Sequence, residues 1–165
     1  MSARPTPGPR FETPGGVPVF LEESHALPLV DVVLLLRRGA LLDPPGSEGL
    51  TRLTARLVRR GPRGIGAEAF DEMLDALGST LQVSVGHEHV RFQGAVLRRN
   101  LGSYLELVGR TLAAPALRAA DLARLKRRST AELAEPRDHD PALAARAFRR
   151  EPFGRHPYGR PVAGT

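Results

Sequence analysis

The stretch GLTRLTARLVRRG, residues 49–61, decides the fold of this chain. Three leucines in it recur at i, i+3 and i+7 and therefore share one stripe of an amphipathic helix: Leu50, Leu53 and Leu57. Arg52 and Arg56 lie four residues apart on a neighbouring face, where two like charges destabilise an isolated helix. Either another part of the chain compensates these arginines or water solvates them, and the helix alone leaves both possibilities open.

Two runs upstream of this helix predict strands. In residues 16–24, Val17, Val19 and Leu21 recur at every second position, and residues 28–38 contain an almost continuous apolar run. The short link between the two runs predicts that they pair as antiparallel strands. The sequence DPPG at residues 43–46 then breaks the chain, and Ser47 is expected to cap the helix, which runs to about Arg60.

The downstream elements are predicted, in order, as a helix, the two strands of a hairpin and three helices: about residues 67–77, 80–85, 89–97, 98–112, 118–135 and 140–150. The tail, residues 151–165, is expected to be a loop. The order β-β-α-α-β-β-α-α-α predicts an α+β fold, in which helices pack on one face of a mostly antiparallel sheet.

Composition excludes several classes of protein. A length of 165 residues with 41% hydrophobic residues suits one domain, expected at residues 16–165 after a flexible lead-in at residues 1–15. The absence of cysteine excludes disulfides, thiolate catalysis and cysteine-based zinc sites. No apolar run reaches the roughly 18 residues that span a bilayer, and the first residues lack the apolar segment of a secretory signal. We therefore expect no membrane partner and a cytoplasmic location.

The formal net charge of +6 comes almost entirely from arginine, because Lys126 is the one lysine. A nucleic-acid-binding protein more often shows clustered Lys and Arg with interleaved aromatic residues or a known module, and neither is visible. We therefore expect no nucleic-acid partner. If the basic residues around the helix did contact phosphates, the affinity would fall steeply with salt; they are Arg52, Arg56, Arg59, Arg60 and Arg63.

Several further stretches surround the helix in a fixed order. They are GVPVFLEES (16–24), VDVVLLLRRGALLDPPGSEG (30–49), LDALGSTLQVSVGHEHVRF (74–92), STAELAEPRDHDP (129–141) and HPYGRPVAGT (156–165). Together with GLTRLTARLVRRG they resemble the first domain of the pitrilysin/insulinase-type zinc peptidases, a family that includes the mitochondrial processing peptidases. The resemblance covers roughly residues 15–165, and it implies that the chain is an incomplete N-terminal domain of a longer protein.

The resemblance also implies where a zinc site would lie. The family carries an inverted motif, H-x-x-E-H, inside a helix that resembles residues 49–61. Arg52 and Arg56 stand where the two His ligands belong, Ala55 stands where the general base belongs, and Glu132 matches the third ligand. Arginine cannot ligate a metal, because its pKa is too high to free a lone pair, and alanine cannot accept a proton. We therefore expect no catalytic residue, no metal ligand and no cofactor.

The same substitutions leave open what the arginines do. They are either exposed helix charges, or one guanidinium takes the position of the metal and pairs with Glu132. A charge-assisted pair there would replace the link that zinc supplies between two helices.

Two functions follow from the resemblance. In the first, the chain is the non-catalytic subunit of a peptidase complex; it helps to form the chamber, binds peptide or unfolded protein, and pairs with an active homologous subunit or with itself. In the second, it is an active zinc metallopeptidase with a displaced site, in which Glu132 acts with His87 or His89. These histidines, at i and i+2, would share one face of a strand. Exposed or turn-capping histidines are the simpler interpretation, and whether this chain is an enzyme by itself stays open.

Overall fold

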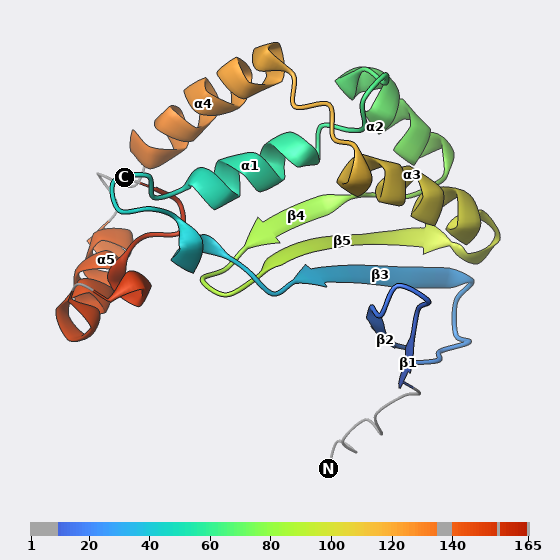
Figure 1. The fold of residues 1–165 in the computed structure, drawn as a ribbon, viewed down its shortest axis with the longest axis horizontal. Helices are drawn as coiled ribbons and strands as arrows, with labels where there is room; N and C mark the ends of the chain where they lie inside the picture. The colour runs from blue at the N-terminus through green and yellow to red at the C-terminus, as the bar shows by residue number, and fades with distance from the viewer. Residues whose placement is uncertain (1–9, 135–139, 155, 165) are drawn as a thin grey trace.

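The computed structural model describes residues 10–134, 140–154 and 156–164 (Figure 1). The strands and helices are β1 (Arg10–Glu12), β2 (Pro18–Phe20), β3 (Leu29–Leu36), α1 (Leu50–Val58), α2 (Ala67–Ala76), β4 (Gln82–Val85), β5 (Val90–Leu97), α3 (Leu101–Ala113), α4 (Ala119–Ala134) and α5 (Asp140–Phe153). Short 3₁₀ turns also occur at η1 (Ala40–Leu42), η2 (Arg98–Asn100) and η4 (Pro157–Gly159). Within these described residues, no helix has the length and apolar character needed to cross a membrane.

The main sheet has the strand order β3-β5-β4, and both pairs of neighbours are antiparallel. Alternate residues of the central strand β5 are buried, beginning at Val90, so one face of the strand points into the core. Helices α1 to α4 all lie on one side of this sheet (Figure 1). The α+β prediction, with a mostly antiparallel sheet covered by helices on one face, is therefore confirmed.

The predicted pairing of residues 16–24 with residues 28–38 is wrong. β2 instead pairs with β1, a strand inside the expected lead-in, and β3 pairs along its whole length with β5. The turn at residues 13–16 explains this choice, because the amide of Gly16 donates to the carbonyl of Thr13 over 2.8 Å and closes a local hairpin. The long apolar strand β3 is then free to pair with β5 and to bury alternate side chains against the core.

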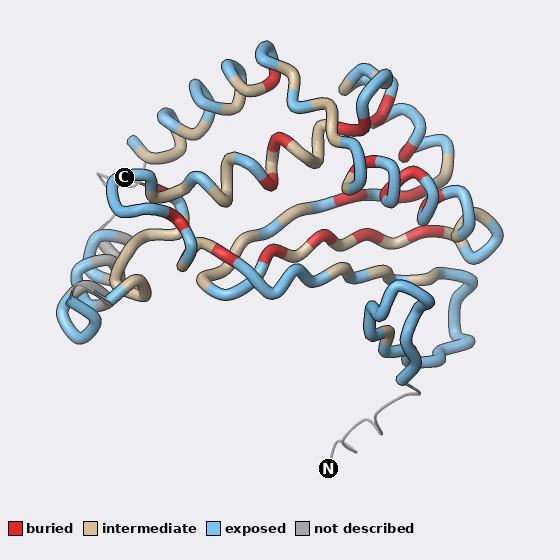
Figure 2. Tube along the Cα trace, in the orientation of Figure 1, coloured by how far each residue is buried: buried red, intermediate tan, exposed pale blue. Residues whose placement is uncertain are grey.

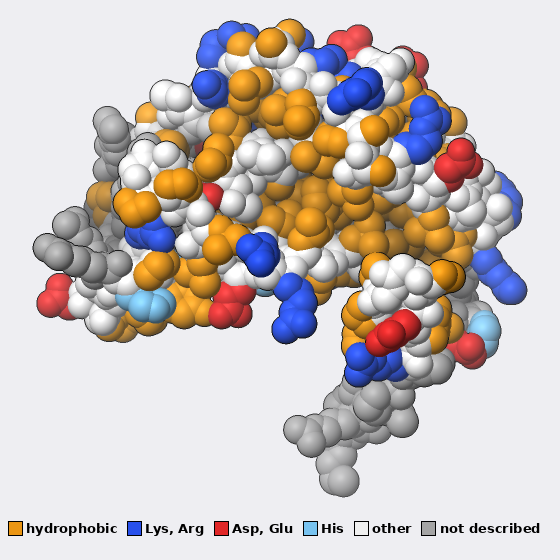
Figure 3. Space-filling model, in the orientation of Figure 1, with side chains coloured by type: hydrophobic (Ala, Val, Ile, Leu, Met, Phe, Trp, Pro, Cys, Tyr) orange, Lys and Arg blue, Asp and Glu red, His pale blue; other side chains and the backbone are white. Residues whose placement is uncertain are grey.

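The core fills the space between the sheet and helices α1 to α3 (Figure 2). Its buried side chains come from every layer: Ala55, Phe70, Leu74, Leu81, Val90, Phe92, Val96, Tyr104, Leu107 and Val108. Figure 3 shows hydrophobic side chains gathered between the helices and the sheet on one face of the molecule. Ala55 turns one face of α1 into this core, and the neighbouring side chains of Arg52 and Arg56 are only partly buried.

Asp43, rather than the expected Ser47, caps the start of α1. The carboxylate of Asp43 accepts hydrogen bonds of 2.9 Å from the amides of Gly49 and Thr51, and one of 2.6 Å from the Thr51 hydroxyl. The N-cap residue is Gly49, with φ of 93°, a left-handed conformation that favours glycine. The upstream loop therefore holds the helix start through a buried carboxylate, because Gly49 has no side chain to do so.

The tail, expected to be a loop over residues 151–165, contains helical structure. α5 continues to Phe153, and η4 follows it. Tyr158 in η4 donates a hydrogen bond to the carboxylate of Glu88, and Arg160 donates one of 2.8 Å to the carbonyl of Asp43. The tail therefore packs on the turn between β4 and β5 and on the loop that caps α1. The end of the helix expected at residues 118–135 lies outside the described residues, because α4 is described only to Ala134.

Candidate functional site

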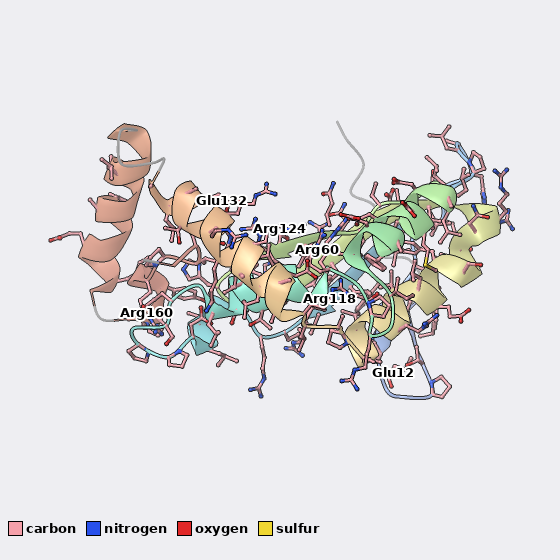
Figure 4. The ribbon with its side chains drawn as sticks, turned by 90° about the horizontal axis from the view of Figure 1, so that it is seen from above. Glu12, Arg60, Arg118, Arg124, Glu132 and Arg160 are labelled. Carbon is pink, nitrogen blue, oxygen red and sulfur yellow. The ribbon has the colours of Figure 1, made fainter. Side chains whose placement is uncertain are left out.

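The packing of α1 against α4 brings Arg52, Arg56 and Glu132 together. Arg56 donates two hydrogen bonds to the two carboxylate oxygens of Glu132, over 2.8 and 2.9 Å. Arg52 donates a third, of 2.9 Å, to Oε2. Figure 4 shows Glu132 near one end of α4, with Arg124 further along the same helix. Of the two possibilities left open by the sequence, pairing with Glu132 is the arrangement that the structure has.

Two residues of α4 complete this contact. Arg128, one helical turn before Glu132, donates from Nε to Oε1 over 3.0 Å. Ser129 accepts a hydrogen bond of 3.2 Å from Arg56. One carboxylate thus meets three guanidinium groups, of which Arg56 is the most buried, with 17% of its side chain exposed. The hydrogen bonds and positive charge of Arg56, followed by those of Arg52, lower the pKa of Glu132 to about 2.

Ala55, the fourth position that the resemblance singles out, is buried in the core with 5% of its surface exposed. It carries no group that could accept or donate a proton, so it offers no general base on α1. A glutamate at this position would place a carboxylate in an apolar setting, where its charged form is costly.

The residues present here do not fit a zinc ion. Zinc sites in proteins use neutral imidazole, thiolate or carboxylate ligands, and guanidinium groups cannot serve. The single carboxylate, Glu132, is already bonded to three arginines. Nowhere in the described part of the chain do three or more His, Cys, Asp or Glu side chains gather in a way that could hold a metal ion.

His87 and His89 do not share a strand face, as the alternative of a displaced metal site required; the simpler interpretation placed them in or beside the turn. β4 ends at Val85 and β5 begins at Val90, so both histidines belong to the turn between the strands. Nε2 of His87 lies 3.3 Å from the carbonyl oxygen of Arg160, and its ring meets the ring of Tyr158 edge-on. His87 therefore helps to hold the tail, and the structure does not bring either histidine to Glu132.

A second ion-pair network, which the sequence did not predict, continues from the end of α1. Arg59 lies 2.6 Å from Asp71 of α2, and Arg60 lies 3.5 Å from the same carboxylate. Asp121, buried at the start of α4, lies 3.7 Å from Arg60 and 2.6 Å from Arg118. Asp71 therefore joins α2 to the end of α1. The pairs of Asp71 with Arg59 and Arg60, and of Asp121 with Arg60, join separate elements, so no pattern within α2 or α4 could have revealed them. The spacing of Arg118 and Asp121, three residues apart, was the one local signal.

A pocket of about 390 Å³ opens between these two networks. Five arginines line it: Arg52, Arg56, Arg59, Arg60 and Arg128. Its apolar wall is formed by Val83 and Val85 of β4 and by Leu125 of α4. The helix that defines the resemblance to the peptidase family therefore borders a basic pocket with one apolar side.

Comparisons with known proteins give relatives of this chain. It is 26% identical over 149 residues to a Helicobacter pylori protein named non-peptidase homolog YmxG, and this match covers 90% of the chain and 34% of that protein. It is 23% identical over 145 residues to a Rickettsia bellii protein named uncharacterized zinc protease, with 86% and 35% covered. The chain thus spans about a third of the length of these curated relatives.

A crystal structure shares the fold of this chain, and a family model shows its family. The fold matches a Pseudomonas fluorescens structure described as a peptidase M16 inactive domain, with a TM-score of 0.88 and 22% identity, over 94% of this chain and 38% of that one. The family model for insulinase, peptidase family M16, matches residues 18–165. The chain therefore belongs to the insulinase family of peptidases, family M16.

Proposed function

We propose that this protein is a non-catalytic member of the insulinase family, and that it helps to form the chamber of a peptidase complex and to hold peptide substrate there. The observation that carries the proposal is the contact of Arg52 and Arg56 with Glu132. On the family resemblance, these three residues stand at the three ligand positions of a zinc site. In this chain they form an ion-pair cluster instead.

The chemistry of the cluster supports an absence of catalysis by this chain. Hydrolysis of a peptide by a zinc peptidase needs an open metal position and a carboxylate that takes a proton from the bound water. Ala55 stands at the position of that carboxylate and is buried. The name of the Helicobacter pylori relative, non-peptidase homolog, agrees with this proposal, whereas the name of the Rickettsia bellii relative describes a protease.

The cluster has a structural role in this proposal. In an active member of the family, zinc would join the two helices that carry its ligands. Here a bidentate arginine–carboxylate contact joins α1 to α4, and such contacts are directional as well as strong. The domain therefore keeps the arrangement of its helices without the metal.

The loss of the site supports a role for an active partner. We propose that a homologous subunit with an intact H-x-x-E-H motif supplies the chemistry, and that this chain supplies a wall of the chamber. Association of two copies of this chain is the alternative arrangement. A cytoplasmic location, with no membrane and no nucleic acid involved, remains a prediction from the sequence.

The proposal is tested by mixing the purified protein with a homologous subunit that carries the intact motif. We expect the protein alone to leave an unfolded test peptide intact, and the mixture to elute as a heterodimer and to cleave the peptide faster than the active subunit alone. As a matched control, a Glu→Gln change at the general base of the active subunit should abolish cleavage and leave the complex intact. Failure to associate, together with cleavage by this protein alone, would refute the proposal.

A further inference from the structure

The arginine-lined pocket between α1, α4 and β4 has a larger positive charge than its carboxylates can balance. Arg52, Arg56 and Arg128 all contact one carboxylate, that of Glu132. The other two lining arginines, Arg59 and Arg60, both contact Asp71. Arg60 also contacts Asp121, a carboxylate that it shares with Arg118. Among the ion pairs of the described residues, five lining arginines thus face three carboxylates, which leaves an excess of at least two positive charges.

Some of these guanidinium groups have N–H donors that could bind a ligand. In the hydrogen bonds of the described residues, Arg52 donates from one terminal nitrogen and Arg128 donates from Nε. Arg128 has 72% of its side chain exposed, so it can turn toward a ligand at little cost. A guanidinium binds a carboxylate through two parallel hydrogen bonds, and this geometry is already present between Arg56 and Glu132.

The walls of the pocket indicate what would carry the anion. Val83, Val85 and Leu125 give it one apolar side, which suits the methylene groups next to a carboxylate. The lining includes no aromatic side chain on which a nucleobase could stack. An acidic side chain of a peptide therefore matches the pocket better than a nucleic-acid phosphate does.

We propose that this pocket binds a carboxylate carried by an acidic side chain of a peptide, so that the protein favours acidic stretches of its substrate. The choice of a peptide as the carrier rests on the proposed function, whereas the preference for a carboxylate rests on the pocket itself. The lowered pKa of Glu132 agrees with the positive surroundings, because neighbouring arginines keep this carboxylate ionised.

Calorimetric titration of the protein with two short peptides that differ only in one Glu or Gln tests the proposal. We expect the Glu peptide to bind about tenfold more tightly at low salt, as one charge-assisted contact would give, and this advantage should shrink as salt is added. Arg52→Gln and Arg128→Gln should each remove most of the difference between the peptides. Arg99→Gln removes the same charge from an exposed arginine outside the pocket and should leave the difference unchanged.

A substitution that should strengthen binding of the Glu peptide separates an effect on binding from an effect on folding. Glu132→Gln removes the carboxylate that competes for the arginines, so this variant should bind the Glu peptide several-fold more tightly although it is less stable. If the cluster served only to hold the helices together, Glu132→Gln would weaken binding or leave it unchanged.

Three results would overturn the proposal. They are equal affinity for the two peptides, equal weakening by Arg99→Gln and Arg128→Gln, or tighter arginine-dependent binding of a single-stranded oligonucleotide than of the Glu peptide. Equal affinity for both peptides would overturn only the preference for carboxylate and would leave peptide holding in place. Selective binding of the Glu peptide by a protein that fails to join or assist an active subunit would instead uphold the pocket and refute the proposed function.

Discussion

Arg56 on α1 and Glu132 on α4, which lie 76 positions apart in the sequence, form a bidentate ion pair with both oxygens of the carboxylate engaged. Arg52 of α1 and Arg128 of α4 also donate hydrogen bonds to this carboxylate. The pair therefore fixes how α4 lies over α1, and both the stability of the domain and the character of its basic pocket depend on it.

Arg56→Ala should lower the free energy of unfolding by about 2 kcal/mol, because the change removes two charge-assisted hydrogen bonds at a largely buried side chain. Urea denaturation gives this value, and Arg99→Ala, at an exposed arginine, should change it by less than about 0.5 kcal/mol. A double-mutant cycle with Glu132→Ala should give a coupling energy of about 1 kcal/mol or more. A coupling energy near zero would mean that the ion pair does not hold the helices.

Stability should fall in acid in a way that depends on Glu132. The arginines lower the pKa of this carboxylate from 4.5 to about 2, so its contribution to folding is complete above about pH 4.5 and is lost as the pH falls toward 2. The difference in unfolding free energy between the wild type and Glu132→Gln should narrow by about 1 kcal/mol between pH 6 and pH 3, after allowance for solvent screening. A difference that stays constant over this range would show that the carboxylate is not paired in solution.

Asp43→Ala should destabilise the protein by about 2 kcal/mol, because it leaves the first amides of α1 without their buried acceptor. Asp75→Ala, at an exposed position near the end of α2, should have little effect. Thermal unfolding followed by circular dichroism compares the two variants. Similar melting temperatures for both would contradict the assignment of Asp43 as the cap of α1.

Gly94→Ala should destabilise the sheet strongly, since a β-carbon at this point of β5 would collide with the carbonyl of Thr80 and the hydroxyl of Tyr104. We expect a loss of more than about 2 kcal/mol, as for other overpacked cores. Gly102→Ala on α3 is the matched control, because its β-carbon meets no atom within 4 Å and alanine favours a helix by about 0.5–1 kcal/mol. The two substitutions should therefore shift the urea midpoint in opposite directions, and shifts of the same sign would contradict this account.

Much of the fold could be predicted from the sequence, because local patterns determine most of its elements. Apolar periodicity located the helices around Leu53 and Phe70, and the short spacing at residues 86–88 located the β4–β5 hairpin. The pairing of β3 was wrong because sequence proximity suggested β2 as its neighbour, whereas burial of its apolar residues required β5. The cap of α1 was also assigned wrongly, to Ser47, because the side chain that reaches the helix comes from an earlier turn.

The candidate site could be predicted only in part. The family resemblance placed Arg52, Arg56 and Glu132 together, although α1 and α4 are far apart in the sequence. The contacts of Asp71 and Asp121 were missed, because a carboxylate on a polar helix face looks the same in the sequence whether it is solvated or paired. Only the packing of α2 and α4 beside the end of α1 distinguishes the two.

The zinc content of the purified protein, measured together with its peptidase activity, tests the central claim most directly. After equilibration with zinc and removal of the excess, we expect far less than one zinc per chain and no cleavage of an unfolded peptide. The double variant Arg52→His/Arg56→His restores the ligand types around Glu132 and should retain more zinc under the same treatment. One zinc per wild-type chain, with turnover of the peptide by this protein alone, would contradict the account.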